Sequence, residues 1–214
     1  MMLFRMLFSR ILFLSVLTVS LSAYAQSFSK LRKQAMSAYK LHDFETAKNF
    51  GIQALEIRPK DVQTNILVGD AEYFLNNYEN ALLYYQKVED KVRHPEMFLR
   101  KASVMLALGR DEEALVNYRI LAHLKPTDPV FRRLISKVYF DRGDYRGALD
   151  EINQAEKLSP LSSPTILGKA QILLKLNRIN ESCEYLNKPQ LTETPEVKIL
   201  REINCNKEKE PLLQ

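Results

Sequence analysis

Apolar residues recur along this chain at the intervals of amphipathic helices. The clearest stretch is Tyr78, Ala81, Tyr85 and Val88, whose spacing places four side chains on one face of a helix. Prolines separate such stretches, because they end one helix or occupy the first turn of the next, where a missing N–H costs nothing. These prolines are Pro59, Pro95, Pro126, Pro129, Pro160, Pro164 and Pro195. The pattern predicts an all-helical chain.

Two rows of small residues divide the chain into five repeats. The members of the second row stand twelve residues after those of the first, which lets two antiparallel helices approach closely at one crossing point. The first row is Ala35, Gly69, Ala102, Ser136 and Ala170, at intervals of 34, 33, 34 and 34 residues, and the second is Ala47, Ala81, Ala114, Ala148 and Ser182. The spacing predicts five helix pairs, over residues 28–61, 62–94, 95–127, 128–161 and 162–188.

A two-residue turn is expected inside each pair. Its first member is Gly or Asn in four repeats, and both tolerate the left-handed backbone that follows a helix. Its second member is Asp or Asn in three repeats and can cap the next helix. The turns are His42-Asp43, Asn76-Asn77, Gly109-Arg110, Gly143-Asp144 and Asn177-Arg178. His42, Arg110 and Arg178 depart from this rule.

This frame resembles the tetratricopeptide repeat family over residues 28–188. The resemblance is fullest at Asp43-Phe44-x-x-Ala47 and Gly143-Asp144-Tyr145-x-x-Ala148. It implies a right-handed α-solenoid of about five helix pairs, in which the first helix of each pair lines a concave groove. It also implies binding of a protein or peptide.

Three positions depart from the family pattern. Gly51 replaces a bulky residue in the first repeat, and Asp111 replaces an aromatic one in the third. Pro189 interrupts the fifth repeat, so its second helix is expected to end near Asn187. Residues 189–214 are expected to form a loop, a capping helix and a polar tail. The cap is expected over Pro195–Asn206, with Val197, Leu200 and Ile203 on its covering face.

The resemblance also assigns candidate groove residues by their register in the first helices. They form an apolar and aromatic strip with basic spots, suited to a peptide with apolar anchors and an acid or two. The rows are Tyr39, Tyr73, Leu106, Phe140 and Leu174; Arg32, Ile66, Leu99, Arg133 and Leu167; and Met36, Asp70, Ser103, Lys137 and Gln171. Packing of the aromatic members against neighbouring repeats is the alternative interpretation.

Residues 1–25 have the pattern of a secretory signal peptide. Arg5 and Arg10 supply a basic start, an uncharged and largely apolar run follows from Ile11, and Ala23-Tyr24-Ala25 predicts cleavage before Gln26. Export to a periplasm or the extracellular side is therefore expected. An uncleaved membrane anchor is the alternative, because no charge occurs between Arg10 and Lys30.

Composition and charge argue against nucleic acid as a partner. The 214 residues are 46% hydrophobic and 27% charged, as in a folded soluble protein. Loss of the N-terminal segment leaves 29 basic and 26 acidic side chains, which alternate in sign rather than forming a basic stripe.

No catalytic or metal-binding motif accompanies the repeats. His42, His94 and His123 are scattered, the serines form no nucleophile motif, and the adjacent acids at residues 111–113 do not face one another across a substrate. We expect neither an enzyme nor a cofactor. Cys183 and Cys205 can form a disulfide in an exported protein, and two unpaired thiols are the alternative.

The expected function is a scaffold or adaptor that binds a partner in the groove, in a bacterial envelope assembly. A periplasmic chaperone that holds one exported client, and a regulatory subunit of an envelope enzyme complex, are the competing hypotheses. The repeats do not name the partner.

Overall fold

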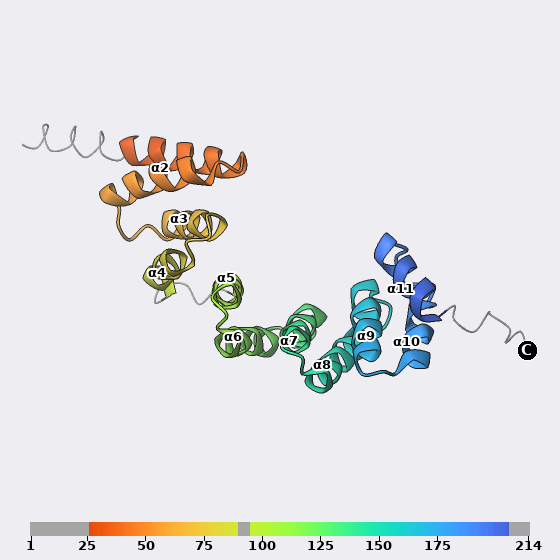
Figure 1. The fold of residues 1–214 in the computed structure, drawn as a ribbon. Coiled ribbons are helices and arrows are strands. Elements are labelled where there is room, and N and C mark those ends of the chain that lie inside the picture. Colours follow the sequence, from red (N-terminus) through yellow and green to blue (C-terminus); the bar gives the residue numbers. More distant parts are fainter. Residues whose placement is uncertain (1–25, 90–94, 206–214) are drawn as a thin grey trace, which may run out of the picture. The chain divides into compact units, whose positions relative to one another are not determined.

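The computed structural model describes residues 26–89 and 95–205, and all regular structure in these residues is α-helical (Figure 1). The predicted signal peptide over residues 1–25 and the tail at 206–214 lie outside them. The chain divides into two compact units, Met1–Leu108 and Gly109–Gln214, here called unit 1 and unit 2. Within the described residues, no helix has the length and apolarity needed to cross a membrane.

Unit 1 begins with helical residues 26–40. Its further helices are α2 (Phe44–Ile57), α3 (Val62–Phe74), α4 (Tyr78–Glu89) and α5 (Pro95–Ala107). Helix α3 packs against both α2 and α4, and α4 also packs against α5. Consecutive helices are therefore neighbours, as the repeat pattern predicts.

Unit 2 continues the pattern of consecutive packing. Its helices are α6 (Asp111–Leu124), α7 (Pro129–Asp141), α8 (Tyr145–Leu158), α9 (Ser163–Lys175), α10 (Ile179–Leu186) and α11 (Pro195–Cys205). Each packs against the next, and α7 also contacts α9 across the intervening α8. This next-but-one contact brings the first helices of the last two repeats side by side.

Both rows of small residues are buried throughout, which confirms their predicted place at the helix crossings. In the last two repeats a serine stands in one row and adds a hydrogen bond across the crossing. The Ser136 hydroxyl donates to the carbonyl oxygen of Ala148 over 2.7 Å, and the Ser182 hydroxyl donates to that of Ala170 over 2.9 Å. Each bond joins the two small positions of one repeat, so the backbones meet there.

The first residue of all five turns has a left-handed backbone. Gly109, Gly143, Asn76 and Asn177 do so as predicted, and His42 does so too, with φ of 59°. Histidine is among the non-glycine residues that tolerate this conformation, so the departure at His42 changes the side chain and leaves the turn intact.

The second turn residue caps the next helix where it is aspartate, and forms an ion pair instead where it is arginine. Asp43 and Asp144 accept the backbone N–H groups of Thr46 and Gly147. Arg110 and Arg178 make no such cap, and each instead binds the glutamate three residues later through Nε at 2.6 Å, Glu113 and Glu181 respectively. The two arginines thus hold an acid near the helix N-terminus, where negative charge is stabilising.

The unusual glycine in the first repeat, Gly51, has a steric reason. A Cβ atom at this position would collide with the Cγ2 atom of Val68, which is itself completely buried. Val68 of α3 therefore fills the space that a bulky side chain fills at this position in other repeats.

The C-terminal helices follow the predicted boundaries, since α10 ends at Leu186 and α11 begins at Pro195. Val197 and Leu200 pack on the last repeat, as expected. The expectation for Ile203 is wrong, because its side chain is 55% exposed. It follows Val197 by six residues, which turns it well away from the covering face of a helix.

A disulfide joins Cys183 of α10 to Cys205 at the end of α11, with the two Cα atoms 5.6 Å apart. The guanidinium of Arg201 reinforces this junction by donating to the carbonyl oxygen of Leu186 from both Nη2 and Nε, at 2.7 and 3.2 Å. Helix α11 is therefore fastened to α10 along its C-terminal half.

Candidate functional site

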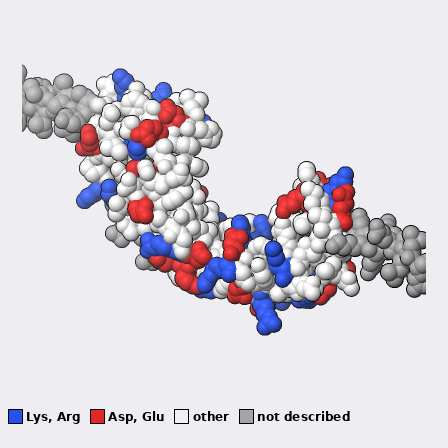
Figure 2. Space-filling view, viewed as in Figure 1, with Lys and Arg blue, Asp and Glu red and all other residues white. Residues whose placement is uncertain are grey.

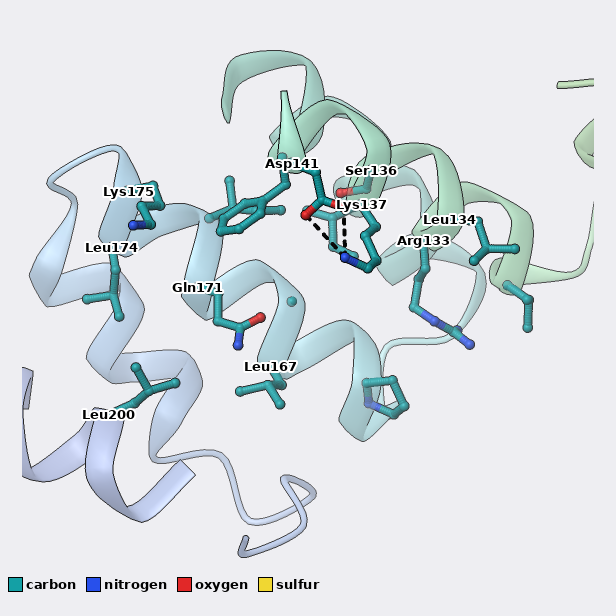
Figure 3. Close-up of a pocket in the computed structure, with 16 residues that line it drawn as sticks. Arg133, Leu134, Ser136, Lys137, Asp141, Leu167, Gln171, Leu174, Lys175 and Leu200 are labelled. Atoms are coloured by element: carbon teal, nitrogen blue, oxygen red, sulfur yellow. Dashed lines mark hydrogen bonds and ion pairs between the residues drawn. The ribbon is translucent and has the colours of Figure 1, made fainter. Parts of the chain in front are cut away.

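A pocket of about 800 Å³ lies in unit 2 along helices α7 and α9 (Figure 3). Ile152 of α8 and Leu200 of α11 complete its lining. The pocket depends on the contact between α7 and α9, which are the first helices of the fourth and fifth repeats. Its volume is within the range of known ligand sites.

Most of the pocket surface is apolar. Ile152 and Ile172 are almost fully buried, and Leu134, Phe140 and Leu167 are half-buried around them. The Phe140 ring packs against the Tyr145 ring in a T-shaped arrangement, with the ring centroids 5.4 Å apart. An apolar side chain entering from a partner would meet preformed hydrophobic walls.

Charged groups of unequal availability border this apolar surface. The Lys137 ammonium lies 2.8 and 3.1 Å from the two carboxylate oxygens of Asp141 in a solvent-exposed ion pair. The side chains of Arg133 and Lys175 have no hydrogen bond or ion pair with any residue in 26–89 or 95–205. Figure 3 shows these two basic side chains at opposite ends of the pocket.

The structure brings together six residues that the sequence assigned to the groove in the last two repeats. All six line this pocket: Arg133, Lys137, Phe140, Leu167, Gln171 and Leu174. Gln171 also donates from Nε2 to the Glu196 carboxylate of α11 over 2.7 Å. Leu200, which completes the lining, was assigned to the cap alone, since nothing in its helical spacing indicates that it reaches a pocket.

Asp70, assigned to the groove in unit 1, has a different setting. Its Oδ1 atom accepts the Tyr85 hydroxyl at 2.6 Å and the Arg100 Nε–H at 2.8 Å, and its side chain is only 15% exposed. Burial, the charge of Asp70 and the hydrogen bond to it raise the pKa of Tyr85 far above its usual value, so the hydroxyl stays a donor. Asp70 thus links α3, α4 and α5.

The aromatic groove candidates of unit 1, Tyr39 and Tyr73, pack on other aromatic side chains of that unit. The Tyr39 ring lies 5.6 Å from Phe44 and 6.2 Å from Phe74, and the Tyr73 ring lies 5.5 Å from Phe74 and 5.6 Å from Tyr78. Phe74 stacks on Phe44 at 4.5 Å yet remains 50% exposed. The groove assignment omitted Phe74, although it directly follows Tyr73.

The remaining candidates of unit 1 lie on three of its helices. Arg32 and Met36 are exposed on the helical residues 26–40, and Ile66 is half-buried on α3. On α5, Leu99 is exposed and Leu106 is half-buried. The Ser103 hydroxyl donates a hydrogen bond to the carbonyl oxygen of Leu99 over 3.1 Å.

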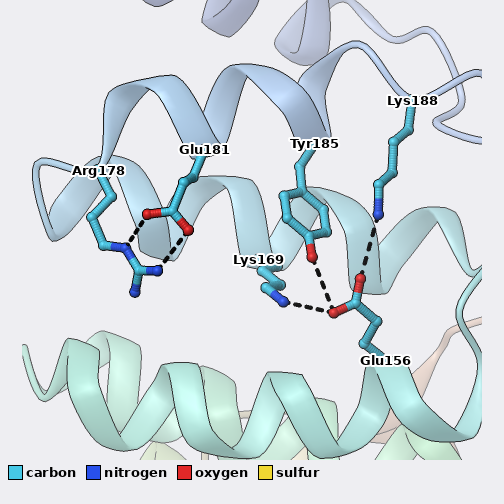
Figure 4. A network of polar contacts seen from close by, with 6 residues as sticks. All are labelled: Glu156, Lys169, Arg178, Glu181, Tyr185 and Lys188. Carbon is cyan, nitrogen blue, oxygen red and sulfur yellow. Dashed lines mark hydrogen bonds and ion pairs between the residues drawn. The ribbon is translucent and has the colours of Figure 1, made fainter.

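A polar network on unit 2 fixes the position of α9 (Figure 4). Glu156 of α8 accepts from the Lys169 ammonium at 2.6 Å, the Tyr185 hydroxyl at 3.2 Å and the Lys188 ammonium at 3.4 Å. The two ammonium groups also lie 4.7 and 3.8 Å from the Tyr185 ring centroid. The network ties α8, α9 and α10 together.

The Glu156 network should make the stability of unit 2 depend on pH. Burial alone would raise the pKa of Glu156, but the hydrogen bonds from Lys169 and Tyr185 and the two lysine charges lower it overall. A lowered pKa stabilises the fold above the unfolded-state value, near 4.3, and this stabilisation is lost as pH falls through the folded-state value. We expect Glu156→Gln to lower the free energy of unfolding at pH 7 by about 1 kcal/mol. The variant should also lose less of this free energy than the unchanged protein as pH falls from about 5 to 3.

Urea denaturation followed by circular dichroism at pH 7, 5 and 3 measures this effect. Glu181→Gln is the matched control, because hydrogen bonding from Arg178 lowers the pKa of Glu181 at an exposed ion pair, which contributes little. An unchanged pH profile in Glu156→Gln would contradict the role assigned to the network.

The described residues hold no group of three or more His, Cys, Asp or Glu side chains arranged for a metal ion. His94 lies outside them. The pocket lining consists mainly of apolar side chains, with the basic groups of Arg133, Lys137 and Lys175 at its border.

Two curated proteins are similar to part of this chain. The anaphase-promoting complex subunit 3 of Schizosaccharomyces pombe is 27% identical over 126 residues, which is 58% of this chain and 19% of that protein. The TPR repeat-containing protein MJ1428 of Methanocaldococcus jannaschii is 27% identical over 129 residues, 59% of this chain and 22% of that protein. The chain thus matches about a fifth of the length of each. No family model matches.

Solved structures resemble the chain over most of its length. A tetratricopeptide repeat protein from Parabacteroides merdae has a TM-score of 0.70 at 20% identity, covering 83% of this chain and 70% of that one. MamA from Desulfovibrio magneticus RS-1 has a TM-score of 0.67 at 16% identity, covering 84% and 97%. YrrB, described as a TPR protein with an unusual peptide-binding site, has a TM-score of 0.59 at 15% identity, covering 77% and 89%. These likenesses concern the fold.

Proposed function

We propose that this chain, a tetratricopeptide-repeat solenoid, is an interaction scaffold that holds a peptide segment of a partner protein in the pocket along α7 and α9. The fold itself indicates a role in protein–protein interaction. The pocket supports the proposal that this interaction takes place on unit 2. Nothing in its lining suggests a reaction, because its only carboxylate, Asp141, is paired with Lys137.

One observation carries this proposal. Six residues that the family resemblance assigns to a groove line a single pocket, and that pocket is apolar with few charged groups. Such a lining suits recognition of a peptide, in which apolar anchors supply affinity and a few polar contacts supply orientation.

The interaction is tested by capturing partners on the intact protein. We expect Phe140→Ala and Leu174→Ala to reduce retention of a specific partner from envelope extract by about tenfold or more, because buried anchor contacts dominate binding. Leu124→Ala is the matched control, since Leu124 is exposed on α6 and does not line the pocket. If Phe140→Ala and Leu174→Ala retain the partner as well as Leu124→Ala does, and all three remain helical by circular dichroism, the proposed site is refuted.

We further propose that the mature protein is exported and works in a bacterial envelope assembly. The pattern of residues 1–25 supports export, and the Cys183–Cys205 disulfide suits an oxidising compartment. The N-terminal sequence of protein recovered from fractionated cells is expected to begin at Gln26. Recovery of the protein in the cytosol with Met1 retained would contradict export.

Co-elution in native extract separates the scaffold from its alternatives. A scaffold is expected in a large stable assembly, whereas a chaperone for one client would bind unfolded segments reversibly. A regulatory subunit would co-elute with an enzyme whose activity changes when the chain is removed.

A further inference from the structure

We infer that the segment held in the pocket has an apolar centre flanked by two acidic side chains, one bound by Arg133 and the other by Lys175. This inference rests on the proposed function and specifies its ligand. It follows from which charges of unit 2 are already paired, from the lining of the pocket and from its length.

The pairing of charges in unit 2 leaves these two bases available. Neighbouring basic side chains have acidic partners within the chain, as in Arg132 with Glu151 at 3.0 Å and Lys169 with Glu156 at 2.6 Å. Arg133 and Lys175 have none among the described residues, although both line the pocket. The pocket's one carboxylate, Asp141, forms an exposed ion pair with Lys137, so the lining has an excess of positive charge at Arg133 and Lys175.

The apolar surroundings favour a carboxylate partner for these bases. Leu134, Phe140 and Leu167 exclude water from much of the site once a ligand covers them, and charge pairs gain strength where water is excluded. The planar guanidinium of Arg133 can also bind a carboxylate through two hydrogen bonds. A basic side chain from a ligand would instead be repelled at both ends.

The length of the pocket sets the spacing of the two acids. Arg133 precedes Phe140 by seven residues and Lys175 follows Leu167 by eight, which corresponds to about 10 to 12 Å along the two helices. Figure 3 shows Arg133 and Lys175 at opposite ends of the pocket. An extended peptide advances about 3.3 Å per residue, so acids four positions apart would reach both bases, with the intervening apolar residues over the hydrophobic centre.

Synthetic pentapeptides with blocked termini test this ligand class. Three probes share a Leu-Phe-Leu centre and carry Glu, Gln or Lys at both ends, and their binding to the intact oxidised protein is measured by calorimetry. We expect the Glu-flanked peptide to bind about tenfold more tightly than the Gln-flanked one and the Lys-flanked one to bind most weakly. The difference should shrink in about 0.5 M salt. Equal binding of all three, or no binding of the Glu-flanked peptide, overturns the inference.

Two variants and one further probe assign the effect to the proposed groups. Arg133→Gln combined with Lys175→Gln should abolish the preference for Glu over Gln, whereas Arg146→Gln on α8, outside the pocket lining, should retain it. Decanoate tests a single-headed anionic amphiphile, and tighter binding of decanoate than of the Glu-flanked peptide also overturns the inference.

The outcomes separate a failure of the acidic preference from a failure of the proposed binding site. If Phe140→Ala weakens the Glu- and Gln-flanked peptides equally while the charge variants change nothing, the pocket binds peptides without the acidic preference. If Phe140→Ala leaves partner capture intact, the proposed function itself fails.

Discussion

Replacing Gly69 by alanine is expected to destabilise unit 1 by about 1 to 3 kcal/mol, although the change adds a single methyl group. The new Cβ atom would lie 2.5 Å from the Tyr85 ring. That ring cannot move aside cheaply, because it is 1% exposed and its hydroxyl is bound to Asp70. The overlap outweighs the gain of up to about 1 kcal/mol that alanine normally has over glycine in a helix.

Gly168→Ala on α9 is the matched control for this prediction. Its added Cβ atom would lie 3.4 Å from the Cδ1 atom of Ile152, an ordinary contact. We therefore expect it to be neutral or stabilising by up to about 1 kcal/mol. Hydrogen exchange of the α3 amides in Gly69→Ala and of the α9 amides in Gly168→Ala measures the two effects. If protection changed by a similar amount in both variants, the close crossing of α3 and α4 would be contradicted.

Reduction of the Cys183–Cys205 disulfide is expected to lower the stability of the C-terminal end by about 3 kcal/mol. The two cysteines are 22 residues apart in sequence, and the bond limits the unfolded conformations of the chain between them. Helix α11 should lose hydrogen-exchange protection before α7 does, because α11 packs mainly on α9 and α10, whereas α7 packs on α6, α8 and α9.

The measurement compares hydrogen exchange in the oxidised and reduced protein. Cys183→Ala combined with Cys205→Ala should match the reduced protein and should not respond to reductant. If α11 kept its full protection after reduction, Val197, Leu200 and Arg201 alone would account for its attachment.

The repeats could be predicted from the sequence because their signal is local. Each crossing needs two small residues at a fixed separation, and the structure buries all ten of them. Helix starts at Pro95, Pro129 and Pro195 follow from the same local chemistry. The helix pairs and the register of the first helix in each repeat can therefore be predicted without knowledge of long-range contacts.

The setting of Asp70 shows what this reasoning could not reach. Its partners, Tyr85 and Arg100, are 15 and 30 residues away, and their convergence depends on side-chain conformations that helical spacing does not specify. The same limit explains the omission of Leu200 from the pocket. By contrast, Arg133 and Phe140 line the same pocket, and the register of α7 places both on one helix face.

Hydrogen exchange of the protein bound to its captured partner tests the central claim most directly. Binding in the pocket predicts new protection of amides in α7 and α9, with α8 affected less and α2 to α4 unchanged. Protection confined to unit 1, or to the outer helices α8 and α10, would contradict the assignment of the binding site to the pocket along α7 and α9.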